Sequence, residues 1–410
     1  MDWLIVAVFV GVYIGMALGR WPGLAINRTG IALIGALVLL LSGAIDGDAA
    51  LASVDFATLS VLLMLMVLSS QYAASGFFDW IGNRITHLDL TPRGLLAGVI
   101  AICGGLSAVM TNDVVVWAVT PILIQGVMAR RLDPRPYVIA VACAANAGSA
   151  ATLIGNPQNL MIAEFGQLDF MAFLLACGVP ALIGLLIVYG VIAFGPMTRA
   201  AFASVSGLAQ VDEDVVIPLD RPMLIKAVVA TIAVIAIFIF IEDRALWSLL
   251  IVAVLLLSRK LGTDQVLGRV DWHLLALFCG LFIVTGAMAG DEAIAAVFRD
   301  ALSGLRIDNP VVLATLSLAG SNTIGNVPLV MMLLSLGPDW TPELLHGLAV
   351  FSTLSGNFLI VGSVANIIAV EQARAAGIVI GFGDYARIGI PVTLISLALA
   401  LVWCMIFLMQ

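Results

Sequence analysis

Apolar residues dominate long stretches of this chain, and short polar segments separate these stretches. Stretches of about 15–25 apolar residues are long enough to cross the hydrocarbon core of a bilayer as helices. The pattern predicts ten crossings, which fall at residues 3–19, 29–43, 56–75, 136–165, 170–195, 222–241, 244–258, 272–290, 342–373 and 388–409. The fold class predicted from this pattern is an all-α polytopic membrane protein.

Polar residues interrupt four apolar stretches partway along their length. Stretches 94–128 and 309–336 are each interrupted near the middle, and we expect each to form a re-entrant hairpin. Spans 136–165 and 342–373 contain clusters of asparagine with glycine or proline, and we expect broken helices there because these residues disfavour a continuous helix. Lipid cannot hydrogen-bond to the backbone, so non-helical chain at membrane depth must be buried in protein or line a cavity.

Similar residues recur in the same order in the two halves of the chain. The matches are Val54-Asp55 with Val270-Asp271 (216 residues apart), Ser107 and Asn112 with Ser321 and Asn326 (214 apart), and Gly155, Asn159 and Glu164 with Gly362, Asn366 and Glu371 (207 apart). Five crossings per half is an odd number, so the second half starts on the opposite side of the membrane. The order predicts two inverted repeats, residues 1–195 and 222–410, joined by a cytoplasmic linker at 196–221.

The basic residues fall mostly on one side of the predicted membrane. With the N-terminus outside, 15 of the 18 lysine and arginine residues lie in cytoplasmic segments, and Arg244, Arg299 and Arg306 lie outside. Because short cytoplasmic loops are enriched in lysine and arginine, this distribution predicts a multi-pass protein of the cytoplasmic membrane with both termini outside.

The composition agrees with a membrane protein and excludes several other classes. Hydrophobic residues make up 62% of the 410 residues and charged residues 11%, far from the balance of a soluble domain. The bilayer is therefore a partner, whereas the absence of a basic patch argues against nucleic acid. The five cysteines show no CxxC spacing and the three histidines are far apart, so we expect no metal beyond a possible sodium ion and no cofactor.

The polar clusters within the apolar stretches are the candidate binding residues. Asn, Ser and Thr supply neutral oxygens, and half-helix ends that point into the membrane carry partial charges, so together they can hold an anion and a small cation. The residues expected to bind substrate are Thr111, Asn112, Asn156, Asn159, Asn326, Ser363 and Asn366. Those expected to bind the coupling cation or proton, besides Asp113, are Ser107, Asn146, Gly148, Ser149, Thr152, Ser321, Ser355 and Asn357. The alternative is that these small residues only allow close helix packing.

Asp113 is the one acidic residue that the pattern places deep in the bilayer. A carboxylate at this depth is expensive, and it typically binds a proton or a cation. Its counterpart in the second half is Val327, so the halves differ chemically here. The alternative is that Asp113 caps the second helix of the hairpin. Asp55 and Asp271, which start two other spans, are interpreted as interfacial.

The clusters resemble the ion transporter superfamily, which includes divalent anion/sodium symporters, arsenite efflux permeases and one class of sodium/proton antiporters. The motifs that carry the resemblance are Thr111-Asn112-Asp113 with Thr120-Pro121, Gly155-Asn156-Pro157-Gln158-Asn159, Asn326-Val327-Pro328 and Gly362-Ser363-Val364-Ala365-Asn366. The resemblance is closest to the small arsenite-permease-like anion permeases. It implies a homodimer whose scaffold domain, residues 1–75 and 222–290, stays fixed. The hairpins and broken helices would form a transport domain that moves as an elevator.

The function expected from these features is cation-coupled secondary transport of a small inorganic or organic anion or weak acid. A sodium/proton antiporter and an arsenite/proton efflux permease remain as alternatives. An intramembrane protease would need two acids at membrane depth, and the pattern supplies only Asp113, so we do not expect an enzyme. A channel would need a continuous pore, whereas binding sites at the midplane favour alternating access.

Overall fold

A computed structural model describes residues 2–21, 23–87, 90–195, 198, 218–241, 243–337 and 339–408, and every regular element in these ranges is a helix. The predicted linker at 196–221 lies mostly outside the described residues. In the first half the helices are α1 (Trp3–Leu18), α2 (Arg28–Leu41), α3 (Gly47–Ser53), α4 (Phe56–Ala74), α5 (Phe77–His87), α6 (Pro92–Val109), α7 (Asn112–Ala129), α8 (Arg135–Ser149), α9 (Pro157–Gly166) and α10 (Phe170–Phe194).

The second half has a similar order of long, short and interrupted helices. They are α12 (Arg221–Phe240), α13 (Arg244–Leu256), α14 (Thr263–Leu267), α15 (Trp272–Gly290), α16 (Glu292–Gly304), α17 (Pro310–Ser321), α18 (Asn326–Leu336), α19 (Pro342–Ser355), a 3₁₀ turn (Ile360–Gly362), α20 (Val364–Ala375) and α21 (Phe382–Trp403), which continues as a π-helical turn (Cys404–Leu408).

Seven helices of the described chain are long and apolar enough to cross a membrane, and the protein is a multi-pass membrane protein. The seven are α4, α6, α7, α10, α12, α15, and α21 with its π-helical turn. Three predicted crossings, 3–19, 29–43 and 244–258, correspond to the shorter apolar helices α1, α2 and α13. At 1.5 Å per residue such helices measure about 20–24 Å, less than the roughly 30 Å of a typical hydrocarbon core.

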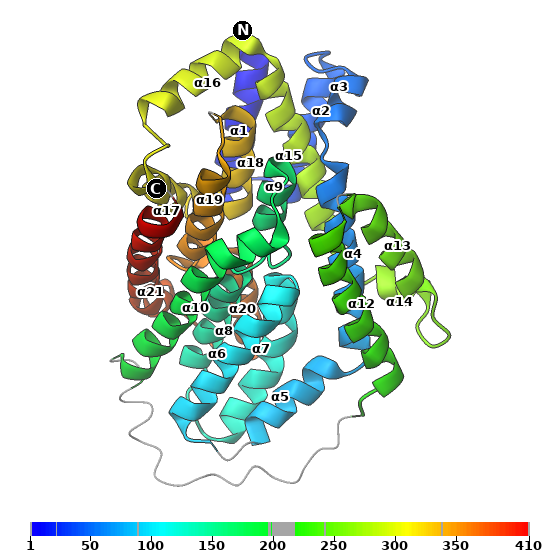
Figure 1. Cartoon of the computed structure of the whole chain (residues 1–410), viewed down its shortest axis with the longest axis vertical. Coiled ribbons are helices and arrows are strands. Elements are labelled where there is room, and N and C mark those ends of the chain that lie inside the picture. Colours follow the sequence, from blue (N-terminus) through cyan, green and yellow to red (C-terminus); the bar gives the residue numbers. More distant parts are fainter. Residues whose placement is uncertain are drawn as a thin grey trace.

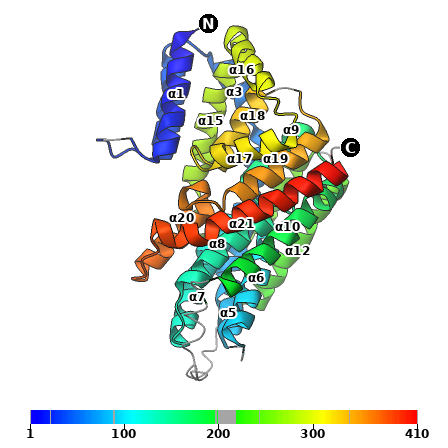
Figure 2. The same ribbon diagram turned by 90° about the vertical axis from the view of Figure 1, so that its left-hand side faces the viewer.

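The two halves of the chain interlock rather than pack as separate bundles. Helix α4 of the first half packs against α12 and α13 of the second, while α15 of the second half packs against α1 and α2. Helices α1, α3 and α16 lie at one end of the molecule, and α5 with the far ends of α6 and α7 lies at the other (Figures 1 and 2). Between these ends α7, α8 and α20 pack together, and α10 lies along α21.

Both predicted hairpins are present as pairs of helices in contact. Helices α6 and α7 meet at a turn through Met110 and Thr111, and both residues are buried. Helices α17 and α18 meet at a turn that ends at Gly325, whose φ of +100° is a conformation that side chains disfavour. The first turn therefore lies inside the protein, where non-helical backbone can be satisfied, whereas the second turn is partly exposed, with Thr323 at the surface.

Both predicted helix breaks are confirmed. Helix α8 ends at Ser149 and α9 begins at Pro157, while α19 ends at Ser355 and α20 begins at Val364. Proline starts α9 because its missing N–H would be unpaired in the first turn in any case.

Four helices were not predicted, because none of them is a long apolar run. They are the short α3 and α14 and the amphipathic α5 and α16. Helices α5 and α16 directly follow α4 and α15, so the two halves carry them at matching places. Both amphipathic helices lie toward the ends of the molecule (Figure 1).

Candidate functional site

A buried network of side chains centres on Asn146 near the end of α8. Its Oδ1 accepts hydrogen bonds from Asn112 Nδ2 at 3.0 Å and from Ser363 Oγ at 2.9 Å. Its Nδ2 donates to Asn357 Oδ1 and Asn366 Oδ1, both at 2.9 Å. Since Asn112 starts α7 while Ser363, Asn357 and Asn366 belong to the second broken helix, one amide joins the first hairpin to both broken helices.

A second network fixes the first break. Asn156 caps α9: its Oδ1 accepts from the backbone N–H of Asn159 at 2.8 Å, and its Nδ2 donates to Ser149 Oγ at 3.1 Å. Asn159 Nδ2 donates to the carbonyls of Ser149 at 3.1 Å and Thr152 at 3.0 Å, which the end of α8 leaves free. Asn156 Nδ2 also reaches Thr353 Oγ1 of α19 at 3.3 Å, so this network too spans both halves.

A third set of bonds ties the second hairpin to the second break. Asn322 Nδ2 donates to the carbonyl of Ser355 at 2.9 Å, and its Oδ1 accepts from the N–H of Leu359 at 3.1 Å. Ser321 Oγ donates to the carbonyl of Ser352 at 3.3 Å. Each hairpin turn is thus hydrogen-bonded to a break.

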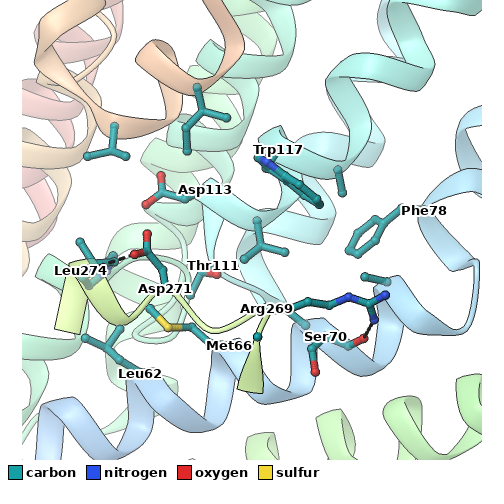
Figure 3. A pocket seen from close by; sticks show the side chains of 18 residues that line it. Leu62, Met66, Ser70, Phe78, Thr111, Asp113, Trp117, Arg269, Asp271 and Leu274 are labelled. Carbon is teal, nitrogen blue, oxygen red and sulfur yellow. Dashed lines mark hydrogen bonds between the residues drawn. The ribbon is translucent and has the colours of Figure 1, made fainter. Parts of the chain in front are cut away.

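A cavity of about 360 Å³ lies beside these networks, between α4, the start of α15 and the starts of α7, α9 and α20. Figure 3 shows it from close by. The helix starts are represented in the lining by Thr111 and Asp113 (α7), Pro157 (α9), Val364 (α20) and Asp271 (α15). Four helix N-termini therefore meet at one cavity, and each carries a partial positive charge from its unpaired N–H groups.

Three charged side chains line this cavity: Asp113, Asp271 and Arg269. In Figure 3 the carboxylates of Asp113 and Asp271 turn toward each other, while Arg269 points away toward Ser70. Arg269 NH1 donates to the carbonyl of Ser70 in α4 at 3.3 Å. Most of the remaining lining is apolar, including Trp117 and Phe78. The cavity therefore combines a few charged groups with an apolar wall, as small-molecule sites do.

Asp113 is not the cap of α7. The N-cap is Thr111, and Asp113 is the second residue of the helix. Within the described chain, the Asp113 side chain accepts no hydrogen bond from a protein group. The capping interpretation therefore does not account for this carboxylate, and its environment is the cavity.

Most of the residues predicted to form a site are joined in the three networks. Those with a network hydrogen bond through side chain or backbone are Asn112, Asn146, Ser149, Thr152, Asn156, Asn159, Ser321, Ser355, Asn357, Ser363 and Asn366. Most of the amide groups of these residues hydrogen-bond to the broken helices. These residues therefore serve helix packing, the alternative given for them above, even if some of them also bind a ligand.

The other predicted residues lie elsewhere. Thr111 and Asp113 line the cavity, and Gly148 lies where α8 touches the backbone of α6 at Gly104. Asn326 Oδ1 accepts from the N–H of Val327 at 2.9 Å and joins none of the networks. Ser107 is buried, and its hydroxyl has no partner among the described residues.

The sequence did not predict the wall of the cavity that α4 and the residues directly before α15 form. Ser69, Ser70 and Arg269 were assigned no role, and Asp271 was interpreted as interfacial. Asp271 does cap α15, accepting from the N–H of Leu274 at 3.0 Å. A charged pair at 269 and 271 directly before a span was the available signal, but nothing in the sequence related it to Asp113.

The fold and the site define a membrane transporter rather than an enzyme, and the comparisons with known proteins agree. The family model described as citrate transporter, CitMHS, matches residues 13–339, and the chain belongs to this family of the ion transporter superfamily. The predicted resemblance to this superfamily is confirmed. The protein is thus a secondary transporter.

Three similar proteins illustrate the relationship. The "46 kDa membrane protein" of Mycobacterium leprae is 28% identical over 429 residues, which cover 98% of this chain and 97% of that protein. The silicon efflux transporter LSI3 of Oryza sativa subsp. japonica is 25% identical over 450 residues, 93% of each chain. The crystal structure of the Alcanivorax borkumensis YdaH transporter has a TM-score of 0.54 at 12% identity and covers 100% of this chain and 98% of that one, a likeness of fold.

Proposed function

We propose that this protein is a cation-coupled secondary transporter that moves a small anion or weak acid across the cytoplasmic membrane. The observation that carries the proposal is the cavity where four helix N-termini meet two carboxylates and one guanidinium. The N-termini and Arg269 attract an anionic group, and the carboxylates attract a cation. A site that attracts both is what coupled transport needs, since each ligand then favours binding of the other.

The charges of the lining favour one form of substrate. With Asp113 and Asp271 ionised and Arg269 protonated, the side chains carry one net negative charge. This charge offsets part of the positive partial charge of the four helix N-termini, so an uncharged weak acid, or an anion that binds together with a cation, is favoured over a free polyanion. Citrate is named in the description of the family, so we place it in the first panel of substrates together with small monovalent oxyanions.

The mechanism proposed is an elevator, in which one part of the two inverted repeats moves across the membrane while the other part stays fixed. Helices α1 to α4 and α12 to α15 would form the fixed scaffold, and the hairpins and broken helices would move. The position of the cavity supports this division, because α4 and α15 supply one wall while α7, α9 and α20 supply the other. The networks around Asn146 and Asn156 would keep the moving elements together as one body. A homodimer with both termini outside completes the proposal.

Asp113 is proposed to bind the coupling ion, a proton or sodium. Its carboxylate faces the cavity and accepts no hydrogen bond from the described chain. In the absence of such partners, a carboxylate in an apolar surrounding is stabilised by a bound proton or cation. Asn112 and Ser363, at the starts of α7 and α20, are proposed as substrate-binding residues.

Uptake into proteoliposomes tests the proposal. The full-length protein would be assayed with a panel of labelled anions, with a pH gradient or a sodium gradient applied separately. We expect Asp113→Asn to abolish the dependence on the driving ion. Asp169→Asn is the matched control, because Asp169 caps α10 through Ala172 N–H at 2.8 Å, does not line the cavity, and asparagine caps equally well. Wild-type driving-ion dependence in Asp113→Asn would refute the coupling role.

A sodium/proton antiporter is the second candidate, because the cavity contains two carboxylates and a cation could itself be the cargo. The same vesicles separate the two functions. Proton movement driven by sodium alone, with no added anion, indicates the antiporter. Sodium- or proton-driven movement that requires an anion or weak acid indicates the permease, and arsenite would be included to test the efflux variant.

A further inference from the structure

Asp113 and Asp271 come from different parts of the chain, yet their carboxylates face each other across the cavity (Figure 3). Asp113 lies in the first turn of α7, in the hairpin, and Asp271 is the N-cap of α15. They are close enough for their negative charges to repel each other. Two facing carboxylates raise the energy of the structure unless a positive charge lies between them.

Two buried hydroxyl groups at the same cavity also lack a protein partner. Thr111 is 5% exposed and Ser69 is 3% exposed, and both line the cavity. Neither Thr111 Oγ1 nor Ser69 Oγ has a hydrogen-bond partner among the described residues. A buried hydroxyl without a partner is unfavourable, so a cation that reaches either oxygen would satisfy it.

We propose that Asp113 and Asp271 together bind one monovalent cation between them, with the hydroxyl oxygens of Thr111 and Ser69 as further ligands. Hard cations prefer carboxylate and neutral oxygens of this kind. The third charged group at the cavity, Arg269, points toward Ser70 and away from the pair. The proposal rests on the proposed function and deepens it, because it adds a second carboxylate to the site of the coupling ion.

The position of the pair links cation binding to movement. Asp113 belongs to an element proposed to move, and Asp271 to an element proposed to stay fixed. If the hairpin moves relative to α15, the carboxylates separate and the cation loses one ligand. The cation therefore binds more tightly in the position seen here than in the other, and this difference in affinity shifts the equilibrium between the two positions. An empty site favours separation, since the two charges then repel each other.

The cap made by Asp271 allows a clean test. Asparagine caps a helix as well as aspartate does, so Asp271→Asn removes the charge and keeps the bond to Leu274 N–H. Asp271→Ser is a second variant that keeps a capping oxygen. The matched control is Asp55→Asn: Asp55 caps α4 through Thr58 N–H at 2.9 Å, is the counterpart of Asp271 in the first half, and does not line the cavity.

A ligand that binds the folded state raises its stability, so cation binding can be measured as a rise in melting temperature. The melting temperature of the purified full-length protein would be measured as sodium chloride replaces choline chloride, at about pH 6 and at about pH 8. We expect a saturable rise with sodium, weaker at low pH, in the wild type and in Asp55→Asn. In Asp271→Asn and Asp271→Ser the sodium midpoint should increase about tenfold or more. If the melting temperature depends on pH but not on sodium, the cation is a proton. This pH dependence must then disappear in both Asp271 variants.

The outcomes separate this inference from the proposed function. If Asp113→Asn loses the cation response while Asp271→Asn keeps the wild-type midpoint, the shared site is refuted and the coupling role of Asp113 stands. If the wild type responds to neither sodium nor pH, both are refuted.

Discussion

The carboxylate of Glu164 and the guanidinium of Arg244 lie 3.6 Å apart, and about a tenth of each side chain is exposed. Glu164 is near the end of α9, and Arg244 begins α13. The same guanidinium donates from NH2 to the carbonyl of Leu168 at 2.8 Å and lies 5.2 Å above the ring of Phe238. The first broken helix is thereby held to helix α13 of the other half.

We expect Arg244→Met to destabilise the protein, because it leaves the Glu164 carboxylate buried without its partner. Breaking a buried ion pair in this way costs about 3–5 kcal/mol. Thermal unfolding in detergent would show the loss as a lower melting temperature. The double variant Glu164→Gln/Arg244→Met should recover much of the loss, and a double variant no more stable than the single one would contradict the ion-pair explanation.

Asn146→Asp should weaken the central network with almost no change of shape. The new oxygen cannot donate to Asn357 Oδ1 and Asn366 Oδ1, and each buried group left unpaired costs about 1–3 kcal/mol. Both the melting temperature and the transport rate should fall. The control is Asn309→Asp, since Asn309 lies outside the networks, caps α17 through Val311 N–H, and aspartate keeps that cap. Equal effects of the two variants would argue against a special role for Asn146.

Gly148→Ala should prevent the close contact between α8 and α6. A Cβ at this position would overlap the backbone of Gly104, which cannot move aside as a side chain could. Overpacking of this kind costs about 1–3 kcal/mol or more. Gly105→Ala is the control, because a Cβ there has nothing within 4 Å and alanine favours the helix. Expression and monodispersity in detergent would be compared, and normal behaviour of Gly148→Ala would show that the helices can separate.

The ion pair of Asp220 and Lys260, with 2.6 Å between Oδ2 and Nζ, should not contribute to pH dependence near neutrality. The hydrogen bond from Lys260 holds the pKa of Asp220 below its usual range. A lowered carboxyl pKa contributes stability that is present above the usual value and lost only as the pH falls through the lowered one. Asp220→Asn, which keeps the cap of α12, should therefore leave the pH profile of transport between about pH 5 and 8 unchanged. A shifted profile would indicate that this pair affects the coupling step.

The predicted spans and breaks agree well with the helices, because lipid requires each membrane-crossing segment to be apolar and to satisfy its own backbone hydrogen bonds. A stretch such as 170–195 has to be apolar to cross the membrane, and α10 occupies nearly the same residues. The break at Asn156-Pro157 is equally local, since proline cannot continue a helix and asparagine caps the next one. The amphipathic α5 and α16 were missed because their polar faces interrupt the apolar pattern.

The candidate site was predictable only in part. The sequence by itself determined that the chain spans the membrane, where its helices break, and that Asp113 is an unusual acid. Only the tertiary structure decided that Asn146 joins both breaks and that Asp271 faces Asp113, 158 positions earlier in the chain. The physical reason is that membrane insertion, helix breaking and capping depend on the residues of one segment. The partners across a cavity, in contrast, depend on how distant helices pack, which no local pattern records.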